Sequence, residues 1–190
     1  MAFASAVNVG FYNLLKLWPE TSARGTAYTV GDVIKPTTYA NHSYKCTTAG
    51  TSHADTEPTW STTNGAVTTD GTAKFTCYDS KTYQIKAKQA DTVPYVTFGL
   101  LTDTPKATFK DMGKWEDLTF WVNCFSDKST ADIAEIADEV MTALDGSTLT
   151  NVTGYTHIVC RREFIGSVIW DSETGIYQIP LRYRIQQSKN

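Results

Sequence analysis

The chain has 190 residues, of which 41% are hydrophobic and 19% are charged, a composition that supports a buried core and excludes a disordered polymer. The net charge of -3 at pH 7 argues against a protein that binds nucleic acid by neutralising phosphates, because such proteins present a basic face. No apolar run reaches the roughly 20 residues that a membrane-spanning helix needs, and the N-terminus lacks the basic segment of a secretory signal. We therefore expect a protein that is made in a cytoplasm and has no membrane partner.

The first predicted element is a short amphipathic helix over residues 7–18. Its apolar side chains recur at spacings of three and four residues, which places them on one helix face: Val7, Phe11, Leu14, Leu15 and Trp18. Pro19 ends this pattern, because proline lacks a backbone N–H and clashes with the preceding helical turn.

From about Arg24 to Asp79 the sequence is dominated by Thr, Gly, Asn, Asp and Ser, with short apolar pieces between turn signals. Asn64-Gly65 and Asp70-Gly71 are strong hairpin signals, because their backbones accept a positive φ. No helical period fits this stretch. It predicts a small module of short antiparallel strands, in which Asp70 and Asp79 are turn formers or solvated strand ends.

Two strands are predicted next, over residues 94–100 and 117–125. In the second strand, alternate positions make one continuous apolar face, as the two-residue period of a strand requires: Leu118, Phe120, Val122 and Cys124. These side chains are therefore expected to face the core.

The clearest predicted helix covers residues 130–144, and its apolar stripe is Ile133, Ile136, Ala137, Val140, Met141 and Leu144. Ser129 is the expected N-cap, Asp132 lies favourably near the positive end of the helix dipole, and Gly146 follows the helix end. Two longer strands over 155–164 and 176–186 follow, joined through a polar turn at 171–175.

This order of elements predicts an α+β fold: a mainly antiparallel sheet with helices packed on one face, plus an inserted small all-β module. The predicted core joins the second strand to the second helix through Leu118, Phe120, Val122, Ile133, Ile136, Val140 and Leu144. We expect the main domain over residues 1–22 and 80–190 and the module over residues 23–79.

The sequence contains no motif of a hydrolase elbow, a zinc protease, a phosphate loop or a dinucleotide fold. His157 lies in a predicted strand with no nucleophile nearby and is interpreted as a packed or surface residue. Arg161-Arg162 is interpreted as a solvated or interface strand edge, with a phosphate contact as the minor alternative. We therefore expect no enzyme, no catalytic residue and no cofactor.

Four cysteines occur, at positions 46, 77, 124 and 160, and none belongs to a CxxC pair. The three histidines do not cluster with them, so no metal site is expected. Cys46 and Cys77 could form a disulfide within the module. Four buried thiols are the favoured alternative, because a reducing cytosol disfavours the bond.

Aromatic residues are frequent in the module although aliphatic residues are few, and three of them are candidates for stacking on sugar rings: Tyr39, Tyr44 and Trp60. The same side chains can instead build the core of a module too small to use Leu and Ile. The core interpretation is favoured for Tyr44 and Trp60, and exposure is favoured for Tyr39.

Several segments of the main domain follow one another in a characteristic order: Phe11-Tyr12-Asn13-Leu14-Leu15-Lys16, Thr82-Tyr83-Gln84-Ile85, Pro94-Tyr95-Val96-Thr97-Phe98-Gly99, Trp115-Glu116-Asp117-Leu118-Thr119-Phe120-Trp121-Val122, Phe125-Ser126-Asp127, Ala131-Asp132-Ile133-Ala134-Glu135-Ile136-Ala137 and Ile179-Pro180-Leu181-Arg182-Tyr183-Arg184-Ile185. Over about residues 1–22 and 80–190, this order resembles the tail terminator (tail completion) family of long-tailed phages. The resemblance implies a virion protein of the tail and neck, made in the host cytoplasm. Its subunits would form a hexameric ring that stops growth of the tail tube and joins the tail to the head connector.

The implied partners are further copies of the chain, the tail tube protein and the connector or neck proteins. DNA would be only cargo that passes through the ring, and the mild negative charge suits such a channel because like charges disfavour binding. Other neck proteins of related α+β design, such as head completion proteins, remain an alternative.

A second resemblance rests on segments between about residues 24 and 79: Tyr28-Thr29-Val30-Gly31-Asp32-Val33-Ile34, Tyr44-Lys45-Cys46-Thr47, Gly50-Thr51-Ser52, Glu57-Pro58-Thr59-Trp60 and Asp70-Gly71-Thr72. They resemble the chitin-binding-like modules of phage structural proteins. The module stands where the terminator family has a short link, so we expect it to project from the ring. The alternative function is a carbohydrate-binding adhesion or decoration protein that recognises a surface polysaccharide through this module.

Overall fold

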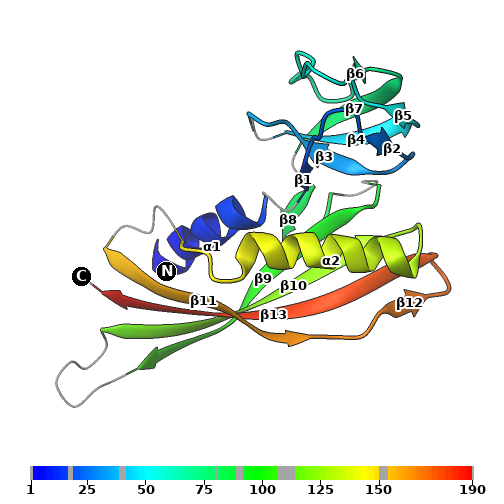
Figure 1. Cartoon of the computed structure of the whole chain (residues 1–190). Coiled ribbons are helices and arrows are strands. Elements are labelled where there is room, and N and C mark those ends of the chain that lie inside the picture. The colour runs from blue at the N-terminus through cyan, green and yellow to red at the C-terminus, as the bar shows by residue number, and fades with distance from the viewer. Residues whose placement is uncertain are drawn as a thin grey trace. The chain divides into compact units, whose positions relative to one another are not determined.

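The computed structural model describes residues 2–16, 19–38, 42–79, 81–88, 92–106, 114–149 and 154–189. The chain divides into two compact units (Figure 1). Unit 1 combines Met1–Trp18 with Thr82–Asn190, and unit 2 is Pro19–Lys81. Strands predominate in both units, and the only two described helices belong to unit 1.

Unit 1 is built on a six-stranded sheet with the order β11-β13-β10-β9-β8, in which β12 also pairs with β13. All its described pairings are antiparallel except that of β8 with β9. Its elements are α1 (Ala2–Leu15), β8 (Thr82–Gln84), β9 (Tyr95–Lys106), β10 (Trp115–Ser126), α2 (Thr130–Leu144), β11 (Tyr155–Ile165), β12 (Ile169–Asp171) and β13 (Ile176–Lys189).

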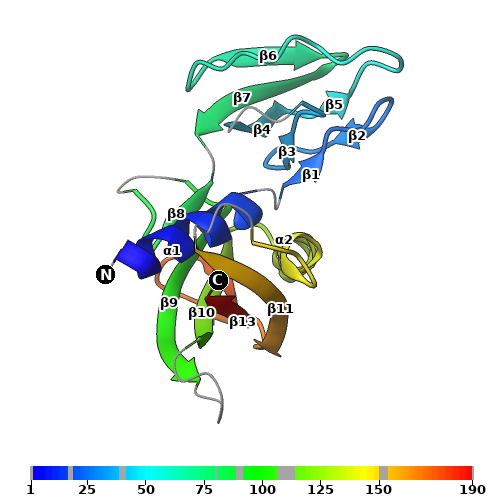
Figure 2. The ribbon, with the colours of Figure 1, turned by 90° about the vertical axis from the view of Figure 1, so that its left-hand side faces the viewer.

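The core of unit 1 lies between the helices and the inner face of β10 and β13. All seven residues predicted to share this core are buried: Leu118, Phe120, Val122, Ile133, Ile136, Val140 and Leu144. The alternating face of β10 is thereby confirmed, since Cys124 is buried as well. α2 contacts β10, β11 and β13, and α1 lies beside α2 over the same sheet (Figures 1 and 2).

Phe11 joins α1 to this core. Its ring stacks on Phe120 with centroids 4.4 Å apart, and it also lies 5.5 Å from Phe98 and 6.4 Å from Tyr183. Aromatic contacts of this kind contribute about 0.5–1.5 kcal/mol beyond the burial of apolar area. The N-terminal helix is therefore fixed to strands that follow it in the chain only after unit 2.

The boundaries of α1 differ from the prediction. The helix covers Ala2–Leu15 rather than residues 7–18, because the alanines before Val7 strongly favour a helix. Val7, Phe11 and Leu15 are buried, whereas Leu14 is half-buried. Trp18, expected on the same face, lies outside the described residues.

The predicted caps of α2 are confirmed. The Ser129 side chain accepts a hydrogen bond from the backbone N–H of Asp132 at 3.1 Å. Gly146 adopts a φ of +70°, directly after the C-cap residue Asp145, a conformation that glycine adopts without the steric cost of a Cβ atom.

The remaining strands of unit 1 are longer or more numerous than predicted. β9 continues to Lys106, β10 begins at Trp115 and β13 reaches Lys189. Two short strands were not predicted, β8 and β12, because three residues carry too little periodicity to be recognised. The polar turn predicted at residues 171–175 does connect β12 to β13.

Unit 2 consists, in its described residues, of short strands: β1 (Glu20–Thr21), β2 (Ala27–Tyr28), β3 (Val33–Lys35), β4 (His42–Thr48), β5 (Gly50–Thr51), β6 (Val67–Asp70) and β7 (Ala73–Asp79). Five of them form a sheet with the order β1-β3-β4-β7-β6, and β2 pairs with β5. Gly71, at a φ of +64°, turns the chain from β6 into β7, as the Asp-Gly signal predicted.

The core of unit 2 is small and largely aromatic: Tyr28, Ile34, Tyr44, Cys46, Ala73, Phe75 and Cys77, with Trp60 packed against it. Asp70, expected to be a solvated turn former, is instead only 2% exposed. Its carboxylate lies 2.9 Å from the Arg24 guanidinium and accepts a hydrogen bond from the backbone N–H of His53. The sequence could not show this, because Arg24 lies far from Asp70 along the chain.

All four cysteines are buried and none is joined in a disulfide, which agrees with the favoured interpretation. Burial raises the pKa of the Cys160 thiol to about 12, and burial likewise raises the pKa of the Cys124 thiol. Both thiols are therefore protonated and unreactive at neutral pH.

Val140→Asp should unfold unit 1, because Val140 has no exposed surface and the new carboxylate would be buried without a partner. We expect a loss of about 3–5 kcal/mol in the free energy of unfolding, measured by urea titration followed by circular dichroism. Ala134→Asp, on the exposed side of the same helix, is the matched control and should change the midpoint little.

Replacing residues 24–79 by a short Gly-Ser linker should leave unit 1 folded, because none of its buried core residues comes from that range. The shortened protein should keep a cooperative thermal transition in circular dichroism. Loss of that transition, with the protein expressed and soluble, would show that unit 1 depends on unit 2 for its folding.

Candidate assembly surfaces

The described residues offer no centre for metal chemistry: no three His, Cys, Asp or Glu side chains among them group as ligands. His157 is half-buried on β11, and burial lowers its pKa. Neither described helix has both the length and the apolar character to cross a bilayer. Unit 1 instead has three surfaces that are candidates for binding another protein. Two lie at the edges of its sheet, and the third is the face of the sheet without helices.

One surface, here called the apolar edge, follows the end of β11 and includes β12. It consists of large apolar side chains that are 39–51% exposed: Phe164, Ile165, Val168, Ile169 and Trp170. Trp170 leans on Tyr177 of β13, with ring centroids 4.3 Å apart. Exposure of such a cluster to water is energetically unfavourable. Exposed apolar patches of this kind mark interaction sites.

The strand at this edge is also open. Among the described strands, β11 pairs only with β13, so its outer backbone groups face no other strand of the sheet. Exposed edge strands are available for pairing with another chain. The apolar edge therefore combines free backbone positions with apolar side chains.

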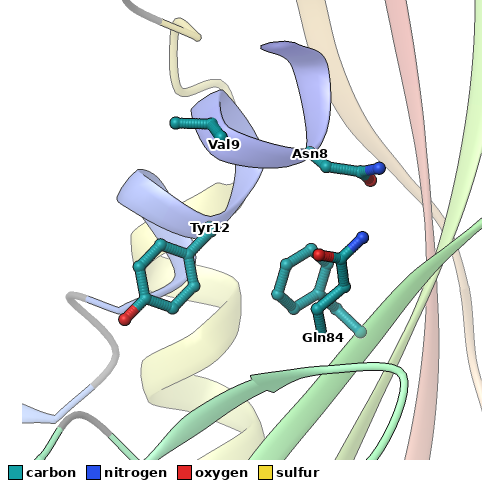
Figure 3. A pocket seen from close by; sticks show the side chains of 5 residues that line it. Asn8, Val9, Tyr12 and Gln84 are labelled. Carbon is teal, nitrogen blue, oxygen red and sulfur yellow. The ribbon is translucent and has the colours of Figure 1, made fainter. Parts of the chain in front are cut away.

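A second surface, here called the α1 pocket, lies at the other edge of the same sheet. It is a hollow of about 510 Å³ lined by Asn8, Val9, Tyr12, Gln84 and Phe98. Figure 3 shows Asn8 and Tyr12 extending from α1, with Gln84 of β8 opposite. The pocket thus has apolar walls and two amide groups, a composition typical of a binding hollow.

The backbone beside the α1 pocket is strained. Ile85, directly after β8, has a φ of +69°, which is a genuine outlier for a β-branched residue. Its N–H donates a hydrogen bond to the Phe98 carbonyl at 2.7 Å, and its side chain is 60% exposed. The structure thus holds an apolar side chain in solvent directly after the pocket residue Gln84, and strain of this kind concentrates at functional positions.

The face of the sheet without helices carries an ion network. Arg184 donates two hydrogen bonds to the Asp117 carboxylate, at 2.6 and 2.5 Å, and contacts Glu163 at 3.2 Å. Hydrogen bonding to Arg184 lowers the pKa of Asp117, and the same contact raises the pKa of Arg184. Arg184, Asp117 and Glu163 therefore neutralise one another within this network, which Lys106 joins at 3.7 Å from Asp117.

Two arginines that the sequence singled out lie on β11. Arg161 is exposed, and Arg162 is half-buried with its guanidinium 3.3 Å from the Asp145 carboxylate at the end of α2. Arg162 therefore ties β11 to α2, while Arg161 remains at the open strand edge.

The three candidate sugar-stacking residues are placed differently. Tyr44 has no exposed surface and donates its hydroxyl hydrogen bond to the Ser61 carbonyl at 3.1 Å. Trp60 is half-buried, with its ring 4.5 Å from that of Tyr44 and 5.5 Å from that of Phe75. Tyr39 lies outside the described residues. The structure therefore brings Tyr44 and Trp60 together, in the core of unit 2.

A carboxylate that the sequence did not single out organises this region. Glu57 accepts hydrogen bonds from Trp60 Nε1 at 2.8 Å, from Ser22 Oγ and the Thr37 N–H at 3.0 Å each, and from the Thr37 hydroxyl. Burial alone raises the pKa of Glu57, but the hydrogen bonds outweigh it and hold the pKa at about 2. Glu57 thereby fixes the orientation of the Trp60 indole.

The sequence shows part of the composition of these surfaces, but it does not show that they are exposed or which segments form them. The run from Phe164 to Trp170 is visibly apolar, but periodicity cannot tell an exposed edge from a buried strand. The α1 pocket and the Glu57 network each join segments far apart in the chain, for which no local signal exists.

Comparison with known proteins finds a family match that lies mainly in unit 1. A family model described as "Tail completion protein gp17" matches residues 71–188, a range that contains β7 of unit 2 and the unit 1 sheet except for the last residue of β13. Among solved structures, a chain of the virion of a native gene transfer agent particle is similar, with 17% identity and a TM-score of 0.46. That similarity covers 57% of this chain and 79% of the other, and at this TM-score it carries no argument. No curated protein matches the chain.

Glu57→Gln should destabilise unit 2 at neutral pH by about 1–3 kcal/mol, because an ionised acceptor of several hydrogen bonds is lost. The folded pKa of about 2 lies below the usual value of 4.5 for a glutamate. The stabilisation is therefore complete above about pH 4.5 and is lost as the pH falls toward 2. Thermal melts followed by tryptophan fluorescence should show the difference between wild type and variant shrinking over that range. Asp55→Asn, in the same loop and exposed, is the control; a difference that stays constant with pH would contradict the assignment.

Proposed function

Since the chain belongs to the tail completion protein gp17 family, we propose that it is the protein that closes the phage tail, assembling as a ring at the end of the tail tube. The family consists of structural virion proteins, and the chain is a structural protein of the tail. In the proposed ring, six copies stop further growth of the tube and join the tail to the head connector and neck proteins.

The apolar edge carries this proposal. A cluster of half-exposed apolar side chains beside an open strand is unfavourable in an isolated subunit. Contact with another subunit would remove both features from water at once. Rings form when one surface of a subunit meets a different surface of the next and the rotation closes, so a surface of this kind is what a ring-forming subunit needs.

The electrostatics are compatible with a ring through which DNA passes. The net charge is -3, and Arg184 of the helix-free face is matched by Asp117 and Glu163. A channel without a basic surface lets the polyanion move without adhering, because phosphate binding is driven by Lys and Arg contacts. DNA is therefore proposed as cargo and not as a ligand.

Residues 23–79 are proposed to be a module inserted into the family fold. Their resemblance to chitin-binding-like modules keeps a carbohydrate-binding role as the alternative function. The geometry supports that alternative weakly, because Tyr44 is buried and the Trp60 indole is held by Glu57. We therefore propose that the module decorates the ring, with its aromatic residues serving chiefly as its core.

The proposal is tested by the mass of the purified protein in light scattering, with and without the matching tail tube protein. We expect a hexamer, or a monomer that becomes a ring on the ends of tubes seen by electron microscopy. A monomer that ignores tube ends contradicts the proposal, and if that monomer binds polysaccharide the functional part is unit 2. The variant that lacks residues 24–79 serves as the matched control and should still form the ring.

A further inference from the structure

We infer that the apolar edge of one copy docks into the α1 pocket of the next copy, so that the ring is built from contacts between opposite edges of the same sheet. This inference rests on the proposed function, because it names the partner of the apolar edge within the ring. Four observations on unit 1 carry it: the position of the two surfaces, their level across the sheet, their shapes and their charges.

The two surfaces lie at opposite ends of the strand order. The apolar edge belongs to β11 and β12, and the α1 pocket is bordered by β8, which pairs only with β9 among the described strands. A contact between different surfaces of identical subunits is heterologous, and it propagates from copy to copy. A single pair of surfaces on this chain could therefore build the whole assembly.

One end of the apolar edge, at Ile165, lies at the level of the pocket along the strands, whereas Trp170 pairs with Tyr177, nearer the start of β13. Ile165 of the apolar edge pairs with Leu181, which pairs in turn with Val122 of β10. Val122 pairs with Phe98, and Phe98 pairs with Gln84 of the pocket. A head-to-tail contact between these two edges forms a ring if the rotation from copy to copy closes.

The apolar edge presents a large half-exposed side chain, and the second surface is a hollow. The apolar edge presents the indole of Trp170, 51% exposed, next to Ile169. The pocket is a hollow of about 510 Å³ with Val9, Tyr12 and Phe98 among its walls, and Tyr12 and Phe98 place their rings 6.3 Å apart. Large aromatic side chains in pockets dominate the energy of protein interfaces. The exposed Ile85, directly after the pocket residue Gln84, adds apolar surface that the same contact would cover.

The turn beside the apolar edge and the segment beside the pocket carry opposite charges, although the Arg182 guanidinium also lies over the Phe164 ring of the apolar edge, 5.9 Å from its centroid. The turn after Trp170 carries the exposed acidic residues Asp171 and Glu173, whereas the segment after Gln84 carries the exposed basic residue Lys86. Docking of Trp170 in the pocket would bring the acidic turn of one copy toward the basic segment of the next. Opposite charges at an interface rim set orientation and reject wrong partners, which favours a second copy of this chain as the occupant over a tube or neck protein.

Cysteine cross-linking tests the contact between copies of the full chain. Lys86→Cys and Glu173→Cys are prepared separately, the native thiols being buried, and the two variants are mixed with tube ends under mild oxidation. A heterologous contact predicts a disulfide-linked dimer in the mixture and none in either variant alone. Dimers in each single variant, or cross-links from Glu173→Cys to the tube protein instead, would overturn the inference.

A second set of variants measures the energy of the contact. Trp170→Ala should weaken self-association at least about tenfold, whereas Trp115→Ala, a half-exposed tryptophan near the other end of the sheet, should leave it unchanged. Glu173→Lys should weaken it about twofold to fivefold, and Lys86→Glu in the same chain should restore it. Circular dichroism melts confirm that each variant is folded before its association is compared.

The outcomes separate this inference from the function on which it rests. If wild-type protein forms rings but Trp170→Ala associates normally and no mixed dimer appears, the ring stands and the docking assignment is wrong. If wild-type protein remains monomeric even with tube ends, the proposed function fails and the contact between copies fails with it.

Discussion

The packing of Phe11 against Phe98, Phe120 and Tyr183 is the contact on which unit 1 depends. It closes a domain whose first helix is separated from its sheet by the whole of unit 2. The entropic cost of closing a loop grows only slowly with its length, by about 0.6 kcal/mol for each doubling. A buried aromatic cluster can therefore hold the helix in place despite the long intervening segment, and the sheet keeps an apolar face that α1 and α2 cover together.

The helices lie over one face of the sheet, and neither edge strand has a further strand beside it among the described residues. β8 and β11 remain the outermost described strands, one next to a pocket and the other continuous with exposed apolar side chains. Isolated proteins usually protect such edges with charges, prolines or bulges. β11 does contain register shifts at two places, yet Phe164 and Ile165 stay exposed at its end. This arrangement is consistent with a subunit whose stable form is an assembly, the state that we propose for this member of the tail completion family.

Unit 2 solves a different physical problem. Unit 2 is small and contains few aliphatic residues. Its core is therefore made largely from Tyr28, Tyr44 and Phe75, with Trp60 beside them. Aromatic side chains bury a large area each, but their polar atoms need partners. Glu57 supplies the acceptor for the Trp60 indole, and the Ser61 carbonyl supplies one for the Tyr44 hydroxyl. An abundance of aromatic residues in a small β module is thus explained by stability without any ligand.

The sequence by itself determined the features that depend on local periodicity and on backbone conformation. The alternating face of β10, the stripe and caps of α2, and the glycine turn between β6 and β7 follow from side-chain spacing and from residues that accept a positive φ. The order of segments in unit 1 was sufficient to indicate the family. Tertiary structure alone decided which strand edges stay open, that Asp70 is buried with Arg24, that Arg184 pairs with Asp117, and that Trp121 covers Gly99. Each of these joins positions distant in the chain, and periodicity carries no information about which distant segments become neighbours.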